Sequence, residues 1–111
     1  MPCHSTRGLG DETQLVLRLR AGQFWAAHGT GQPPTAGATD TFSASVNVTP
    51  TTASVAQAFP GARRITPGSH AESLLWLLAS RRGNYQMPPL VSHRVDEVGT
   101  MLLADWIDSL K

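Results

Sequence analysis

Residues 67–84, PGSHAESLLWLLASRRGN, decide the fold class of this chain. Ser69 is a suitable helix N-cap, and Glu72 stands three residues later as its capping-box partner. Apolar residues then follow at helical spacing, basic residues occupy the last turn, and Gly83 marks the stop. This pattern predicts a helix over about residues 70–82.

A second helix is predicted at the end of the sequence. Asp96 is a suitable N-cap, and apolar side chains then recur at helical spacing, which is typical of a helix with a broad apolar face. That face comprises Val98, Met101, Leu102, Leu103, Trp106, Ile107 and Leu110. We expect Met101 in the core, together with Trp76 and Trp106. These two helices indicate a mostly α fold.

The first half of the chain carries weaker signals. Residues 29–57 are rich in Gly, Pro, Ser and Thr, which predicts a long irregular central loop. Within this loop residues 45–49, SVNVT, are expected to form a brief extended piece. Residues 13–20, TQLVLRLR, alternate in a way that favours a half-buried strand or an extended stretch on the core. A chain of 111 residues is expected to form a single domain, residues 1–111.

Composition excludes several classes of function. Nine Lys and Arg against eight Asp and Glu create no strong field, so we expect no nucleic-acid partner. No apolar run approaches the roughly 20 residues of a membrane span, and no signal peptide is visible. A single cysteine excludes an internal disulfide.

The first residues, MPCH, match the end of a known attachment motif. A c-type haem is attached at C-x-x-C-H, where two cysteines form thioethers and the histidine ligates iron. Cys3 and His4 match its last two positions, and Met1 and Pro2 match its spacers. The first cysteine would precede Met1, so we interpret the chain as truncated within this motif.

Three further motifs follow in order over residues 62–110: I-x-P-G-x-x-x-x-S-L-L, then M-P-P-L, then V-D-x-x-G with W-I. Together with the Cys-His pair they resemble the C-terminal half of a class I c-type cytochrome domain, particularly those that end larger secreted bacterial proteins. The matching residues are Ile65, Pro67, Gly68, Ser73, Leu74, Leu75, Met87, Pro88, Pro89, Leu90, Val95, Asp96, Gly99, Trp106 and Ile107.

The resemblance implies a cytochrome c-like helical domain that transfers electrons through haem c and is not an enzyme by itself. It implies His4 as the proximal iron ligand, Cys3 as a thioether anchor and Met87 as the distal ligand. A thioether donor raises the reduction potential, and two prolines after Met87 stiffen its loop. The implied partner is a redox protein or a domain fused upstream, and the implied location of the parent protein is periplasmic or extracellular. Without haem, the porphyrin's neighbours should be exposed: Leu74, Leu78, Met87 and Leu90.

Several alternatives remain open. Met87 could fill a gap between helices in a haem-free structural or interaction module. His28, His70 or His93 could replace it as second ligand. Arg63 and Arg64 could pair with haem propionates or form an ordinary exposed basic pair. A single thioether, a noncovalent b-type haem and an empty apo-domain are all compatible with one cysteine. A metal site of Cys3, His4 and another histidine fits no zinc spacing.

Overall fold

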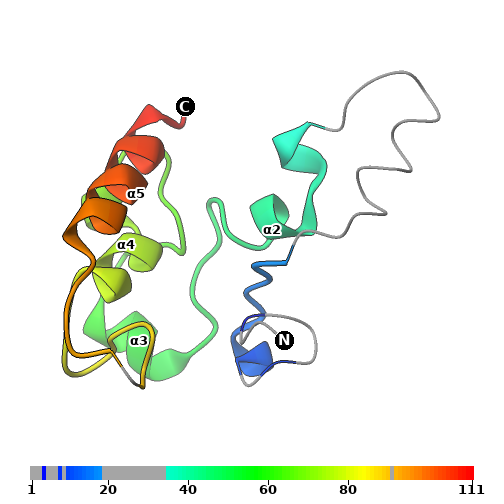
Figure 1. Ribbon diagram of the computed structural model, residues 1–111. Helices are drawn as coiled ribbons and strands as arrows, with labels where there is room; N and C mark the ends of the chain where they lie inside the picture. Colours follow the sequence, from blue (N-terminus) through cyan, green and yellow to red (C-terminus); the bar gives the residue numbers. More distant parts are fainter. Residues whose placement is uncertain (1–3, 5–7, 9, 19–34, 91) are drawn as a thin grey trace. The chain divides into compact units, whose positions relative to one another are not determined.

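A computed structural model covers the chain and describes residues 4, 8, 10–18, 35–90 and 92–111 (Figure 1). The chain divides into two compact units, Met1–Ser45 and Val46–Lys111, and the structure defines each unit by itself. That both units form one domain therefore stays a prediction. The described regular structure is helical with isolated β-bridges, so the mostly α prediction is confirmed.

The first unit consists of short turns of helix. It contains the 3₁₀ helices η1 (Asp11–Thr13) and η2 (Ala36–Ala38) and the single-turn helix α2 (Asp40–Ser43). Thr39 caps α2 by accepting a hydrogen bond from the Phe42 N–H at 3.2 Å. The buried side chains among its described residues are the hydroxylic Thr39 and Ser45, so hydrogen bonds carry more of its internal order than apolar burial.

The predicted extended segments are partly confirmed. Residues 15–18 form an irregular stretch and not a strand, with Leu17 exposed; residues 19 and 20 lie outside the described part. In the second unit Val46 forms a parallel bridge with Ile65, and the Arg64 N–H donates to Val48 O at 2.8 Å. The expected extended piece at 45–49 is therefore reduced to these single contacts on either side of a turn, because Asn47 has a φ of +59°. The predicted loop 29–57 is less irregular than expected, since its described part also contains η2, α2 and most of α3 (Ala53–Ala58).

The predicted helix at 70–82 is shorter and is interrupted. It consists of η3 (His70–Glu72) and α4 (Leu74–Ala79), separated by Ser73 in an extended conformation. Ser73 is fully buried, and its Oγ donates to Ser69 O and accepts from the Thr66 N–H, both at 2.8 Å. Within the described residues the Ser69 side chain makes no capping bond, so the capping-box prediction is wrong. Tertiary hydrogen bonding overrides the local helical pattern.

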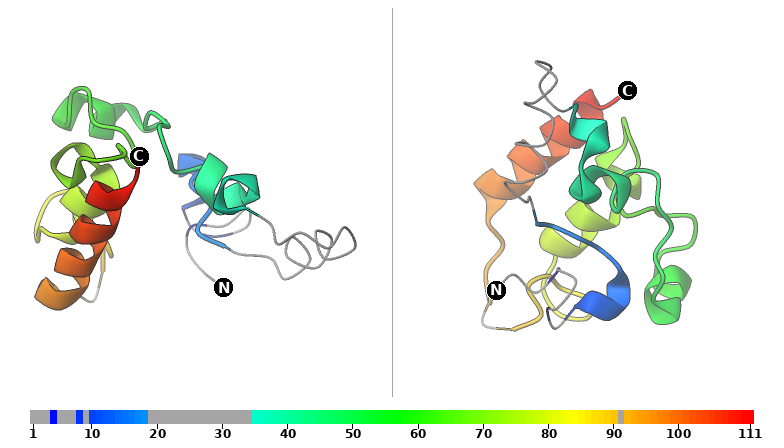
Figure 2. Two further views of the ribbon diagram at one scale, coloured as in Figure 1. Left: turned by 90° about the horizontal axis from the view of Figure 1, so that it is seen from above. Right: turned by 90° about the vertical axis from the view of Figure 1, so that its right-hand side faces the viewer.

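The second predicted helix is confirmed as α5 (Glu97–Ser109), capped by the Asp96 carboxylate, which accepts from the Gly99 N–H at 2.9 Å. α5 lies against α4 (Figures 1 and 2). The apolar core of the described residues comprises Ile65, Leu74 and Ile107, the last fully buried. Three further contacts hold α5: the Gly68 N–H donates to Ile107 O at 3.0 Å, the His70 N–H to Asp108 Oδ1 at 2.9 Å, and Trp76 Nε1 to Thr100 O at 3.0 Å.

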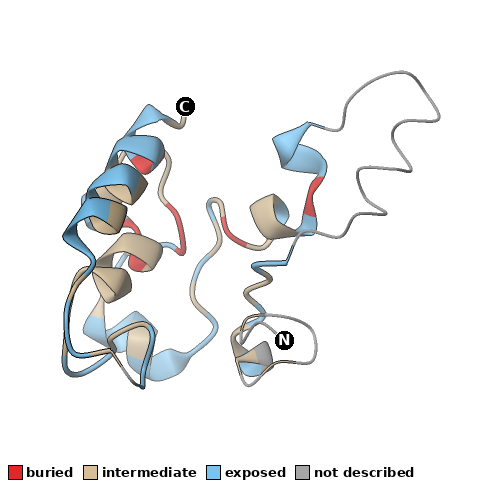
Figure 3. Ribbon diagram, in the orientation of Figure 1, coloured by how far each residue is buried: buried red, intermediate tan, exposed pale blue. Residues whose placement is uncertain are grey.

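The predicted apolar face of α5 is only partly buried (Figure 3). Met101 is 67% exposed and Trp106 is 46% exposed, so their assignment to the core is wrong. The apolar residues of α5 surround the helix, and those opposite Ile107 face away from α4. Trp76, by contrast, is half-buried beside α5.

In the part of the chain that the structure describes, every helix is too short or too polar to cross a lipid bilayer.

We expect Gly99 and Asp96 to be energetically coupled. A Cβ on Gly99 would lie 2.9 Å from Asp96 Cγ, closer than packed atoms come, so Gly99→Ala should displace the capping carboxylate. Its helix-propensity gain of about 1 kcal/mol should then be offset by loss of a cap worth about 1 kcal/mol. In an Asp96→Ala background the same change should stabilise the protein by up to about 1 kcal/mol. Urea unfolding of the four proteins in this double-mutant cycle measures the coupling, and equal effects in both backgrounds would disprove it.

Candidate functional site

His4 belongs to the first unit and lies in a small hydrogen-bond network. Thr13 Oγ1 donates its single proton to Gly10 O at 2.7 Å and lies 3.2 Å from His4 Nδ1. Because that proton is already engaged, Thr13 can only accept from the ring, which favours the tautomer with the proton on Nδ1. Nε2 is then the nitrogen with a free lone pair. Histidine ligands in metalloproteins are generally held in this way through their other ring nitrogen.

The backbone around His4 is also held. Its carbonyl oxygen accepts from the Leu17 N–H at 3.0 Å, and the Leu15 N–H donates to Thr13 Oγ1 at 3.3 Å. The stretch 15–18 therefore packs back on His4 through main-chain contacts. These contacts orient the residue independently of any ligand.

Met87 belongs to the second unit and lies in the loop between α4 and α5. It is half-buried, its N–H donates to Leu78 O at 2.9 Å, and the Met87–Pro88 peptide bond is cis. The loop is thereby connected directly to the last turn of α4. Leu90 in the same loop is 76% exposed.

Gln86 closes this loop, a role that its sequence motif does not predict. Its Oε1 accepts from the Gly83 N–H at 2.8 Å, and its Nε2 donates to Pro88 O and to Ser92 O, both at 3.0 Å. One side chain thus connects three points of the loop around Met87. The only signal in the sequence is a long amide directly before Met-Pro-Pro and after the glycine turn at Gly83.

Two arginines, Arg81 and Arg82, form hydrogen bonds where the loop leaves α4. Arg81 Nε donates to Leu77 O at 2.7 Å, and Arg82 Nη1 donates to Ala79 O at 3.1 Å, which satisfies carbonyls at the end of α4. Arg82 Nη2 reaches Arg94 O on the other side of the loop at 2.6 Å. Arg81 also stacks on the Phe59 ring with its Cζ 4.6 Å from the centroid.

The predicted ligand set is therefore only partly visible. Cys3 lies outside the described residues, while His4 and Met87 belong to different units. Their convergence on one iron stays a prediction. Thr13 and Gln86 are the residues that contact or hold the two predicted ligands within their own units.

The alternative histidine ligands differ in their surroundings. His70 Nδ1 lies 2.7 Å from Asp108 Oδ2, and its ring meets Trp76 edge-on at 4.6 Å. These contacts connect η3 to the end of α5 and give His70 a structural role. His93 is exposed, and His28 lies outside the described residues. Among those residues no group of three His, Cys, Asp or Glu side chains is arranged to hold a metal ion.

Two further expectations are corrected. The pair Arg63 and Arg64 is not uniformly exposed, because Arg64 is buried and burial lowers its pKa. Arg63 donates through Nη1 to Asn47 O at 2.8 Å. Of the leucines expected to be exposed without haem, Leu90 is exposed but Leu74 is buried, because Leu74 packs in the core with Ile107.

No protein-family model, curated protein or solved structure matches this chain.

Replacing Gln86 with Glu should loosen the Met87 loop. The carboxylate can still accept from the Gly83 N–H but loses both donors, and it places charge beside Pro88 O and Ser92 O. Two lost hydrogen bonds should lower the free energy of unfolding by about 1–2 kcal/mol and speed hydrogen exchange of the Met87 amide. The matched control is Gln57→Glu on exposed α3, which carries the same charge change. If both variants change the free energy of unfolding and the hydrogen exchange of the Met87 amide equally, Gln86 does not hold the loop.

Stability at low pH should depend on Asp108. The backbone N–H and the ring of His70 lower the pKa of this carboxyl below its ordinary value of 3.8. A lowered folded-state pKa stabilises the protein above the ordinary pKa, and this contribution is lost as pH falls below about 4. Urea midpoints between about pH 5 and pH 3 should therefore fall less in Asp108→Asn than in the unaltered chain. Asp105→Asn on the same helix is the control, and equal pH slopes for the two variants would contradict the role of His70.

Proposed function

We propose that the chain is an electron-transfer domain that binds haem through His4 and Met87, with Cys3 as thioether anchor. The observation that carries the proposal is the hydrogen bond between His4 Nδ1 and Thr13 Oγ1. It leaves the Nε2 lone pair for iron and holds the ring orientation. The donor set also suits the group, because an imidazole with a thioether is the axial pair of c-type cytochromes.

The Met87 loop supports the proposal from the other unit. Gln86 and the hydrogen bond to Leu78 O restrict where the sulfur can lie, and both prolines restrict the backbone after it. Because its loop is held in this way, Met87 would move little when the charge of the haem iron changes. Small movement between oxidation states is what electron transfer requires.

Bound haem would supply one-electron redox chemistry. The chain's own residues would orient the ligands: Thr13 holds the His4 ring by accepting a hydrogen bond from it, and Gln86 holds the loop that carries Met87. The chain would act as a carrier for a redox partner or a fused upstream domain and not as an enzyme. Covalent attachment through Cys3 would imply a periplasmic or extracellular parent protein, whereas a noncovalent haem would need only the two ligands.

A haem-free structural or interaction module is the second candidate. It is favoured by the core of the second unit, where Ile65, Leu74 and Ile107 are buried. In this alternative Met87 fills space beneath its loop. A sharp thermal transition of colourless protein would support the module, while an apo-protein that gains cooperativity only with haem would support the electron carrier.

Ligand variants test the proposal. Ferric haem added to the purified chain should give the absorption spectrum of a six-coordinate haem. Met87→Ala should keep the haem but lower its reduction potential, because the soft sulfur donor is lost while the imidazole remains. His4→Ala should lose most of the haem.

The matched controls are Met101→Ala on the exposed side of α5 and His93→Ala in an exposed loop. Both should retain the spectrum and potential of the unaltered chain. If Met87→Ala leaves the potential unchanged, another residue holds the distal position; if His4→Ala retains haem, the proposed proximal ligand is wrong.

A further inference from the structure

Helix α5 carries apolar side chains on two opposite sides. Ile107 is fully buried on the side toward α4. The other side exposes four large apolar residues, which we call the outer strip: Val98, Met101, Leu102 and Trp106. Figure 3 shows this outward side as exposed along the helix.

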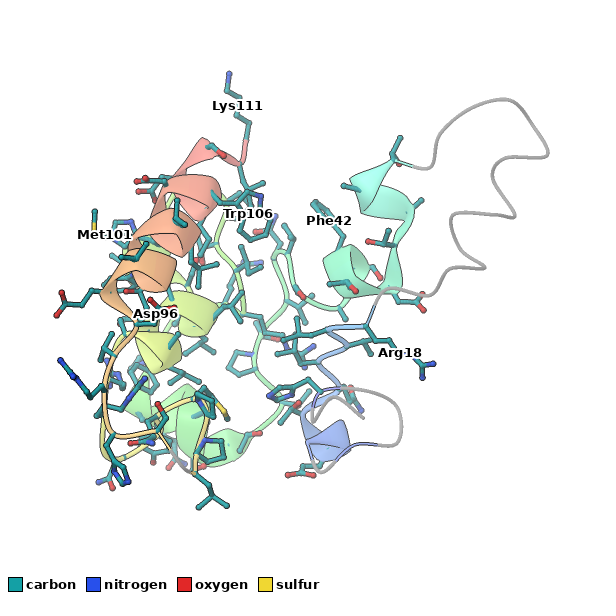
Figure 4. The ribbon with its side chains drawn as sticks, viewed as in Figure 1. Arg18, Phe42, Asp96, Met101, Trp106 and Lys111 are labelled. Carbon is teal, nitrogen blue, oxygen red and sulfur yellow. The ribbon has the colours of Figure 1, made fainter. Side chains whose placement is uncertain are left out.

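The outer strip is continuous along the helix. At 3.6 residues per turn, Met101 and Trp106 lie about 140° apart around the axis, with Val98 and Leu102 between them. Figure 4 shows Met101 and Trp106 projecting from opposite sides of α5, so they form the two edges of the strip. A spacing of three, four and eight residues is how amphipathic helices present anchor side chains to a groove or to another helix.

The fold of the second unit does not require the outer strip. α5 is already held by the burial of Ile107 and by hydrogen bonds from Gly68, His70 and Trp76. Four large apolar side chains in one continuous exposed row mark an interaction surface and not the scatter of single residues found on most surfaces.

Charge restricts what can cover the strip. Asp105 lies within it, three residues after Leu102 on the same side of α5, and Glu97 stands four residues before Met101. Residues 95–110 contain four acidic residues and no Lys, Arg or His. Covering the strip would take water away from Asp105, and a desolvated carboxylate must be paired. An uncharged apolar occupant would leave it unpaired, an anionic membrane would be repelled, and a second copy docked α5 on α5 would bring carboxylates together.

We propose that the outer strip binds an amphipathic helix of a partner protein, whose apolar face is flanked by lysine or arginine positioned opposite Asp105 and Glu97. Four anchor side chains correspond to a small interface, and small interfaces are typical of transient complexes. This proposal concerns a surface separate from the Met87 loop and does not depend on haem.

A model peptide tests the proposal with the full chain. The probe is a labelled amphipathic peptide of leucine and lysine, (LKKLLKL)₂, and the matched peptide carries glutamate at every lysine position. Fluorescence anisotropy should show binding of the leucine–lysine peptide and none of the leucine–glutamate peptide. Asp105→Asn should weaken binding at low salt and lose this effect at high salt, since salt screens the pairing.

Surface variants show whether the peptide uses the strip. Leu102→Lys should weaken binding at least about tenfold, because it removes an anchor and adds a like charge. Gln57→Lys on exposed α3 adds the same charge elsewhere and should change affinity much less. Both positions are exposed, so circular dichroism should show unchanged folding. Equal effects of the two variants, or equal binding of both peptides, would overturn the proposal.

Other occupants would give distinct results. Sedimentation should show a monomer; a dimer abolished by Leu102→Lys would identify a second copy as the occupant and contradict the proposal. Binding of the chain to vesicles of zwitterionic and anionic lipid that Leu102→Lys abolishes would likewise contradict it.

Discussion

The buried hydroxyl of Ser73 is the constraint on which the second unit depends. A polar atom removed from water must be hydrogen-bonded, and Ser73 Oγ meets this requirement with Ser69 O and the Thr66 N–H. These bonds hold Ser73 extended, so helix cannot continue from His70 to Ala79. The break lets the Leu74 and Leu75 N–H groups donate to Arg63 O and Arg64 O at 2.8 and 3.0 Å. Donors that a helix start leaves unpaired are thus satisfied by a neighbouring segment, so α4 begins without a side-chain cap among the described residues.

The same constraint positions α5. Ser73 closes the turn over residues 66–69, in which Gly68 adopts a φ of +78° that side-chain-bearing residues rarely adopt. In this conformation the Gly68 N–H reaches Ile107 O, and the neighbouring His70 holds Asp108 with its backbone and its ring. The C-terminal half of α5 is therefore held by directed hydrogen bonds together with one fully buried apolar side chain. Because α5 needs only a few apolar contacts with the rest of the second unit, most of its apolar residues can face outward.

The sequence predicted those features that depend on interactions between residues close together in the chain. Asp96 and Gly99 are three residues apart and form the predicted cap, so the start of α5 was predictable. The break at Ser73 was not predictable, because it depends on Arg63 and Thr66 from another segment. Periodicity showed that α5 is apolar but could not show which side faces α4, and Met101 and Trp106 were placed wrongly for that reason. For the candidate site, the resemblance of the Cys-His and Met-Pro-Pro-Leu motifs to those of a known family suggested His4 and Met87, whereas the contacts of Thr13 and Gln86 belong to no motif.

The position of Met87 follows from the same chain of contacts. Prolines restrict backbone angles but do not decide where a loop lies, and that decision requires bonds to fixed elements. The Met87 N–H bond to Leu78 O attaches the loop to α4, whose start is set by Ser73 and whose end is satisfied by Arg81 and Arg82. Gln86 then closes the loop from within through Gly83, Pro88 and Ser92. Because the Leu77 N–H donates to Ser73 O at 2.9 Å and the Met87 N–H donates to Leu78 O, a perturbation at Ser73 would reach Met87 through α4.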